Sequence, residues 1–123
     1  MNYDIEAMDM DMLNEVRSIL KARWPEMVEG FLEDTEMYIE NIKNGFANDD
    51  KMAVASSAHP LKSSSGSMGF TGLSEIAKKI EYDAKDAIEN GGDIYPLQEL
   101  VPLLEEGMEY AKAKLRATLE DAA

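Results

Sequence analysis

The chain has 123 residues, of which 45% are hydrophobic, and these values suit one globular domain with a single core. The net charge of −13 argues against nucleic acid and anionic membrane surfaces as partners, because both are bound through basic side chains. The absence of cysteine excludes disulfides and thiolate metal sites and is compatible with a reducing compartment. There is no apolar run of membrane-spanning length, and the acidic N-terminus lacks the pattern of a signal peptide, so we expect a cytoplasmic protein.

The first half of the chain predicts two helices after a loose lead-in over residues 1–8. Asp9 or Asp11 can cap a short first helix that ends about two residues before Pro25. Pro25 suits the first turn of a second, long helix that reaches about Ala47. The apolar stripe of this second helix consists of Val28, Phe31, Leu32, Thr35, Ile39, Ile42 and Phe46.

A third helix is predicted to begin after Asp50, which can cap it, and to extend to about Met68. Pro60 lies inside this helix and lacks a backbone N–H, so it should bend the helix or leave a carbonyl near Ser56 unpaired. The face of the helix that we expect to be buried is formed by Val54, Ala58, Leu61, Ser65 and Met68.

Two more helices complete the prediction. The fourth has a plausible cap in Thr71 and a strong stop signal in the sequence Asn90-Gly91-Gly92. The last helix opens at Pro96, unless Pro102 delays its start or kinks it. The apolar stripe of the fourth helix consists of Leu73, Ile76, Ala77, Ile80, Ala84, Ala87 and Ile88. The residues expected off that stripe are Lys78, Lys79, Glu81 and Lys85.

His59 is the only histidine of the chain and lies one step off the predicted buried face of the third helix. Its ring is therefore expected at the rim of the core or in solvent. Lys62 lies three residues further on, so its ammonium should stand one turn away on the same side. An imidazole and an ammonium on a surface of small side chains would suit the docking of a partner. Those small residues are Ala55, Ser56, Ser63 and Gly66.

The run Ala-His-Pro-Leu-Lys-Ser-Ser-Ser-Gly-Ser-Met-Gly, from Ala58 to Gly69, resembles the signature of histidine phosphotransfer (HPt) domains. These domains are the phosphoryl carriers of two-component phosphorelays. The resemblance lies in the Ala-His pair, the aliphatic residue and Lys62 at two and three residues past His59, and a glycine at ten. Ser63 stands where the family usually has glycine. The implied fold is all-α: an up-and-down antiparallel four-helix bundle with a short additional N-terminal helix, formed by one domain over residues 1–123.

The resemblance also implies a function. His59 would accept a phosphoryl group from a receiver-domain phosphoaspartate and pass it to another receiver aspartate, as a neutral imidazole is a good nucleophile near neutral pH. Lys62 would stabilise charge on the transferred group. The sequence has no Gly-rich phosphate loop followed by Lys-Ser or Lys-Thr. We therefore expect a phosphoryl carrier without an ATP site or a cofactor, rather than an enzyme acting alone.

The partners implied are response-regulator receiver domains and a hybrid sensor histidine kinase, and we expect a monomer. A single histidine excludes a histidine-rich metal site, and any Mg²⁺ in the reaction would belong to the receiver. Ser63, Gly66 and Ala55 are candidate partner contacts because small side chains permit close approach, although ordinary helix packing is the leading alternative. Pro60 and Ser63 also keep open a non-catalytic helical interaction domain that binds a receiver or another partner without phosphoryl transfer.

Overall fold

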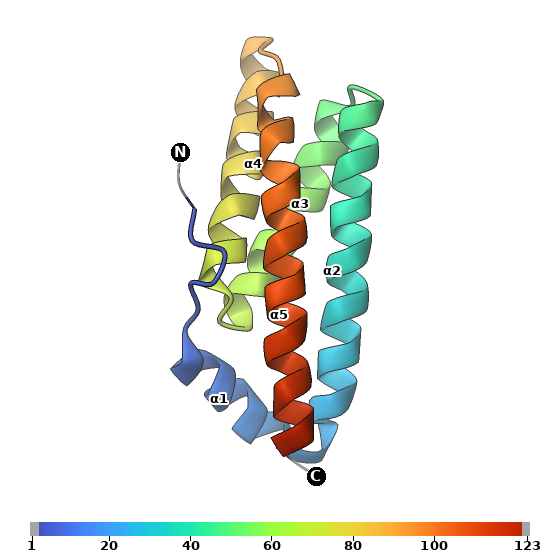
Figure 1. Cartoon of the computed structure of the whole chain (residues 1–123). Coiled ribbons are helices and arrows are strands. Elements are labelled where there is room, and N and C mark those ends of the chain that lie inside the picture. The colour runs from blue at the N-terminus through green and yellow to red at the C-terminus, as the bar shows by residue number, and fades with distance from the viewer. Residues whose placement is uncertain (1–2, 122–123) are drawn as a thin grey trace.

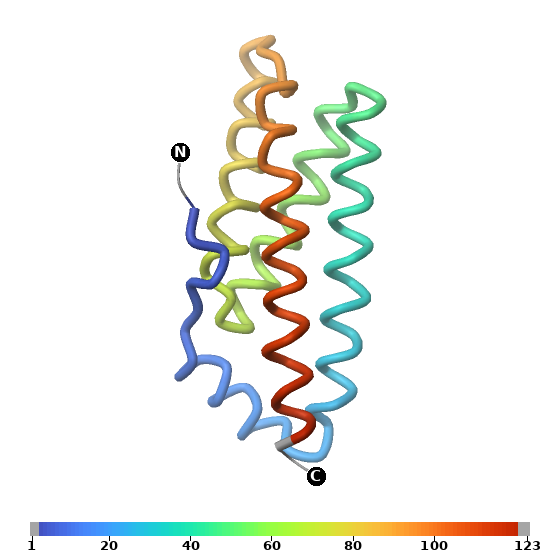
Figure 2. The backbone as a smooth tube through the Cα atoms, viewed as in Figure 1, coloured from blue at the N-terminus to red at the C-terminus, as the bar shows by residue number. Residues whose placement is uncertain are grey.

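A computed structural model describes residues 3–121 and contains no strand in that range. The helices are α1 (Met10–Leu20), α2 (Trp24–Ala47), α3 (Lys51–Ser67), α4 (Thr71–Asn90) and α5 (Val101–Asp121), with short 3₁₀ segments at Lys21–Arg23 and Tyr95–Leu100. Helices α2 to α5 run alternately up and down, and α1 lies across the end of the bundle where α5 finishes (Figures 1 and 2). The predicted all-α class and bundle topology are confirmed. None of the helices within the described range is long and apolar enough to cross a membrane.

The core is formed where the apolar stripes of the four long helices meet. Helix α3 packs against α2 and α4, and α5 also packs against α2 and α4, so the four helices form a closed ring of antiparallel neighbours. Burying a Leu, Ile or Val side chain completely contributes about 1.5–3 kcal/mol, so these stripes are the main source of stability. The fully buried side chains include Val28, Ile42, Val54, Leu61, Ile76, Ile80, Leu104 and Leu115.

Several predicted helix ends are present in the structure. Asp9 caps α1 by accepting a hydrogen bond of 3.0 Å from the Met12 N–H, and Asp50 caps α3 in the same way through the Ala53 N–H. Helix α4 ends at Asn90 and is capped by Gly91, whose φ of 74° lies in the left-handed region that favours glycine. The caps at Asp9 and Asp50 and the stop signal before Gly91 were therefore predicted correctly from local sequence.

Two helix starts differ from the prediction. The cap position of α4 is Phe70, because Thr71 is already the first helical residue. The predicted last helix is divided: residues Tyr95–Leu100 form a 3₁₀ segment, and α5 begins at Val101. Pro102 is thereby placed in the first turn of α5, where a backbone N–H has no partner within the helix and its absence costs little.

The segment before α1 was expected to be loose, but its described part is tied to the turn between α3 and α4. The Asp9 N–H donates to the Gly69 carbonyl at 2.7 Å, and the Gly72 N–H donates to the Ala7 carbonyl at 2.9 Å. The backbones approach so closely that a Cβ atom at Gly72 would collide with the Asp4 carbonyl oxygen. This clasp fixes the end of the α3–α4 pair; the first two residues of the chain lie outside the described part.

Candidate functional site

His59 stands on α3 at the edge of the interface with α4. Its side chain is 59% exposed, in agreement with its place one step off the buried face. Helix α3 continues through Pro60 without interruption, so His59 and Lys62 are presented from one helix. The residues predicted to form the buried face of α3, namely Val54, Ala58, Leu61, Ser65 and Met68, are all buried.

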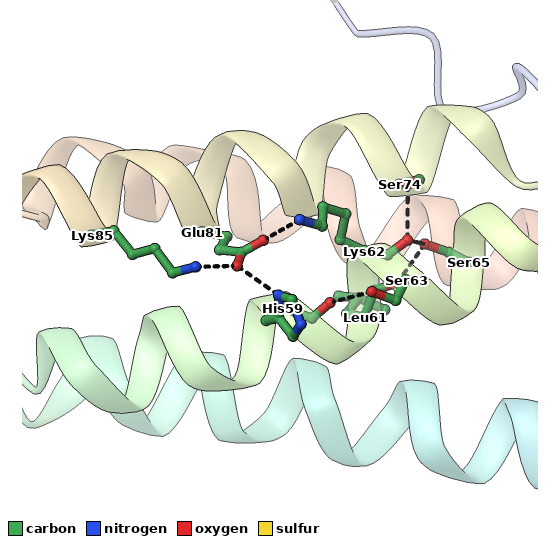
Figure 3. A network of polar contacts seen from close by, with 8 residues as sticks. All are labelled: His59, Leu61, Lys62, Ser63, Ser65, Ser74, Glu81 and Lys85. Carbon is green, nitrogen blue, oxygen red and sulfur yellow. Dashed lines mark hydrogen bonds and ion pairs between the residues drawn. The ribbon is translucent and has the colours of Figure 1, made fainter.

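Opposite His59, α4 contributes a carboxylate that is completely buried. Glu81 is 0% exposed. Its Oε2 atom lies 2.7 Å from His59 Nδ1 and 2.7 Å from Lys85 Nζ, and its Oε1 atom lies 2.7 Å from Lys62 Nζ (Figure 3). One imidazole and two ammonium groups from two helices therefore converge on a single carboxylate.

These contacts keep Glu81 ionised in spite of its burial. Burial by itself raises the pKa of a carboxyl group, since the charged form loses its hydration. Hydrogen bonds from Lys62, Lys85 and His59 outweigh this effect and lower the pKa of Glu81 to about 2. The hydrogen bond to Glu81 in turn raises the pKa of Lys62, against the opposing effect of desolvation. One carboxylate and two ammonium groups leave a net positive charge beside the imidazole ring.

The buried carboxylate also determines which nitrogen of His59 carries the proton. An ionised carboxylate can only accept hydrogen bonds, so we assign the proton of the neutral ring to Nδ1, which donates to Glu81. Nε2 then holds the free lone pair. Because Nδ1 contacts Glu81 and the side chain is 59% exposed, we infer that Nε2 is the nitrogen that a reacting group can reach.

Lys62 is held on the same side as His59, as its spacing predicts. Its side chain is 22% exposed, and its ammonium lies 4.9 Å from the centroid of the Tyr82 ring, a distance typical of a cation–π contact. The Tyr82 side chain is itself half exposed. Glu81 and Tyr82 thus fix the Lys62 ammonium close to the imidazole without removing it from solvent.

The three small residues proposed as partner contacts differ in accessibility. Ser63 is exposed, and its hydroxyl donates to the His59 carbonyl at 3.3 Å. Gly66 is half-buried, and a Cβ atom there would lie 3.2 Å from Ser74 Oγ on α4, so its small size serves the packing of α3 on α4. Ala55 is only 3% exposed and belongs to the core. Ser63 therefore presents its side chain most openly beside the ring.

Two residues of the site were missed by the sequence analysis. Both Glu81 and Lys85 were expected off the apolar stripe of α4, and for Glu81 this is wrong. Glu81 follows Ala77 by four residues and precedes Ala84 by three, so it lies within the stripe. A carboxylate between alanines on an apolar face was the signal that could have identified it. Lys85 is 54% exposed, but its ammonium returns to Glu81 one turn away.

Comparison with known families assigns the chain to one of them. The Hpt domain model matches residues 26–120, which is most of the chain. The chain belongs to the Hpt domain family. Hpt domains are phosphoryl carriers of two-component phosphorelays rather than ATP-binding kinases, and their partners are receiver domains. The resemblance found in the sequence and the general carrier role that it implied are confirmed.

Two solved structures share the Hpt fold over nearly the whole chain. Histidine-containing phosphotransfer protein B (HptB) from Pseudomonas aeruginosa is 17% identical, with a TM-score of 0.83 over 94% of this chain and 96% of that one. The HPT domain of an Hpt sensor hybrid histidine kinase from Shewanella is 16% identical, with a TM-score of 0.70 over 96% of this chain and 97% of that one. A comparison with curated proteins finds no match. At these identities the structural similarity establishes the fold alone.

Proposed function

We propose that this Hpt domain is a phosphorelay intermediate that carries the phosphoryl group on His59. The group would arrive from the phosphoaspartate of one receiver domain and leave to the aspartate of another. The observation that carries this proposal is an exposed imidazole whose Nδ1 is tied, at 2.7 Å, to a buried carboxylate that two lysines share. Family membership supports the carrier role, and the site geometry favours His59 as the carrier.

The accepting step needs no proton transfer at His59. The Nε2 lone pair attacks the phosphorus atom, the N–P bond forms, and the P–O bond to the aspartate breaks with both electrons leaving on the aspartate carboxylate. The ring becomes an imidazolium ion that retains its proton on Nδ1. Glu81 accepts that proton's hydrogen bond and stabilises the positive charge through a contact of 2.7 Å. When the phosphoryl group passes to the next aspartate, a carboxylate oxygen attacks phosphorus and the N–P bond breaks. The imidazole then leaves as a neutral ring with both electrons, which the positive charge on the phosphorylated ring favours.

The two lysines would serve the phosphoryl group itself. Electrostatic stabilisation and positioning are the main contributions of a protein to phosphoryl transfer. Lys62 is held beside the ring by Glu81 and Tyr82, so it is placed before the partner arrives. Lys85 has a side chain that is 54% exposed, which leaves it free to turn from Glu81 toward the phosphoryl oxygens. Together they would offset the negative charge of the phosphoryl group and of the receiver aspartate during transfer.

We further propose that the chain acts only in concert with its partners, without an ATP site of its own. The kinase that supplies the phosphoryl group would be a hybrid sensor histidine kinase, and the exchange would take place in the cytoplasm. An acidic domain, with a net charge of −13, suits partner surfaces that carry basic residues.

The test is transfer from a labelled receiver domain. Incubation with a ³²P-phosphorylated receiver is expected to label the protein with an acid-labile, alkali-stable species, and His59→Gln is expected to abolish the label. Circular dichroism of the variant controls for folding, which should be unaffected because the side chain is 59% exposed. Label on His59→Gln would show that another residue is the carrier. A non-catalytic interaction domain would instead bind receivers equally well with either residue and never yield phosphohistidine.

A further inference from the structure

A hollow of about 510 Å³ lies beside His59 in the groove between α3 and α4. Two of its lining residues are large apolar side chains with unusual exposure: Met52 is 63% exposed and Ile88 is 39% exposed. His59 and Lys85 form another part of its lining, so the hollow adjoins the reactive ring directly (Figure 3 shows both side chains). We call it the His59 hollow; it is lined by Met52, Ala55, Ser56, His59, Lys85, Ile88 and Glu89.

The positions of the two apolar residues follow from helix geometry. Met52 precedes His59 by seven residues, so it stands on the same face of α3, two turns away. Ile88 follows Glu81 by seven residues and occupies the equivalent place on α4. Ile88 was predicted to join the buried stripe of α4. Its exposure means that this stripe continues out of the core and onto the surface next to the site.

The surface on the other side of His59 along α3 has a different character. Ser63 and Ser67 are exposed there, and their hydroxyls donate to carbonyls of their own helix. The ring of His59 therefore lies between an apolar hollow toward the start of α3 and a bare polar surface toward its end. A partner that covers the ring meets these two surfaces on opposite sides.

We propose that the His59 hollow receives an aliphatic or aromatic side chain of the receiver domain, and that this contact sets the orientation and selectivity of docking. The inference rests on the proposed function. A receiver that brings its phosphoaspartate to Nε2 must lie over the exposed part of the ring, and the ring is itself a wall of the hollow. A receiver docked over the ring therefore adjoins the hollow during transfer, and burying Met52 and Ile88 against one of its apolar side chains would favour this position.

The experiment measures phosphoryl transfer from a panel of receiver domains of the same genome, each phosphorylated with acetyl phosphate. Met52→Gln, Ile88→Gln and the double variant keep helix propensity and similar length but remove the apolar surface. The double variant is expected to lower kcat/KM at least about tenfold for receivers that label the wild type, through a higher KM with little change in kcat. Met37→Gln on α2, where the side chain is 49% exposed, is the matched control and should stay within about twofold.

A second readout separates docking from chemistry. Phosphoramidate is a small donor that needs no protein interface, so it should label the double variant and the wild type at His59 equally fast. Loss of phosphoramidate labelling in the double variant would mean that the substitutions impair the reactivity of His59 itself. Transfer from receivers at the wild-type rate by the double variant would mean that no receiver side chain enters the hollow. Either result overturns the inference while the proposed function stands.

If sedimentation shows that the wild type is a dimer and the double variant a monomer, the hollow would be assigned to a second copy of the chain instead. Failure of every receiver and of phosphoramidate to label the wild type would refute the proposed function and this inference with it.

Discussion

Replacing Glu81 by glutamine removes the negative charge that His59, Lys62 and Lys85 share, while the shape of the side chain is nearly unchanged. Glutamine is also a close mimic of the protonated carboxylic acid. The variant therefore reports how much the ionised carboxylate contributes to the folded state. Because Glu81 is completely buried, solvent does not compensate for the loss of its contacts.

The magnitude follows from the pKa of Glu81. It is about 2 in the folded protein, whereas the ordinary value for glutamate is 4.5. One pKa unit corresponds to about 1.4 kcal/mol, so ionised Glu81 contributes roughly 3 kcal/mol to the free energy of unfolding at neutral pH. A lowered folded-state pKa means that this stability is fully present above pH 4.5 and is lost as the pH falls toward 2. By pH 3 the contribution should have fallen to about half.

The assay is urea unfolding followed by far-ultraviolet circular dichroism between pH 7 and pH 3, at constant ionic strength. Glu81→Gln is expected to be roughly 3 kcal/mol less stable than the wild type at pH 7, and the difference should narrow below pH 5. Glu36→Gln, which removes an exposed carboxylate from α2, serves as the control and should show little difference at any pH. A difference that does not change with pH, or one below about 1 kcal/mol at pH 7, would refute the argument that cationic partners hold Glu81 ionised.

Four further substitutions test the fold. Gly72→Ala should destabilise the protein by about 1–3 kcal/mol because its Cβ would meet the backbone of the N-terminal clasp. Gly30→Ala should stabilise the protein by about 0.5–1 kcal/mol, because no atom lies within 4 Å of the new Cβ. Urea unfolding of the two variants tests whether the clasp contributes to stability. Thr35→Val should stabilise by about 1 kcal/mol, since the Thr35 hydroxyl is buried and has no hydrogen-bond partner among the described residues. Thr118→Val should have the opposite sign, a loss of about 1–3 kcal/mol, because Thr118 Oγ1 accepts the buried Trp24 indole N–H at 2.7 Å. Equal melting temperatures for the two valine variants would contradict the distinction drawn between the two hydroxyls.

Local sequence was sufficient for several features whose deciding interactions lie within one helix. Apolar spacing identified the buried face of α3, and the same spacing placed His59 beside that face and Lys62 one turn away. The side chains of Asp9 and Asp50 cap helices because the N–H groups they accept from are three residues ahead. These features depend on separations of a few residues, which the backbone geometry fixes by itself.

Tertiary structure decided the features that join distant segments. The clasp on Gly72 pairs the start of the chain with the turn before α4, so it could not be predicted from the residues of the lead-in alone. Ile88 lies in an apolar stripe that was predicted to be buried, yet the neighbouring helices leave its side chain exposed. Which part of an amphipathic face is buried depends on where the neighbouring helices end. The sequence of a single helix does not contain this information.

The sequence alone predicted a helical bundle and identified His59 and Lys62 as residues of its site. It did not reveal that a carboxylate 22 residues further on would meet that imidazole. A charged group is stable inside a protein only when partners compensate its lost hydration, and two of the three partners of Glu81 lie on another helix. The burial of Glu81 is thus a property of α3 packed against α4 and not of α4 itself, which is why only the folded structure could show it.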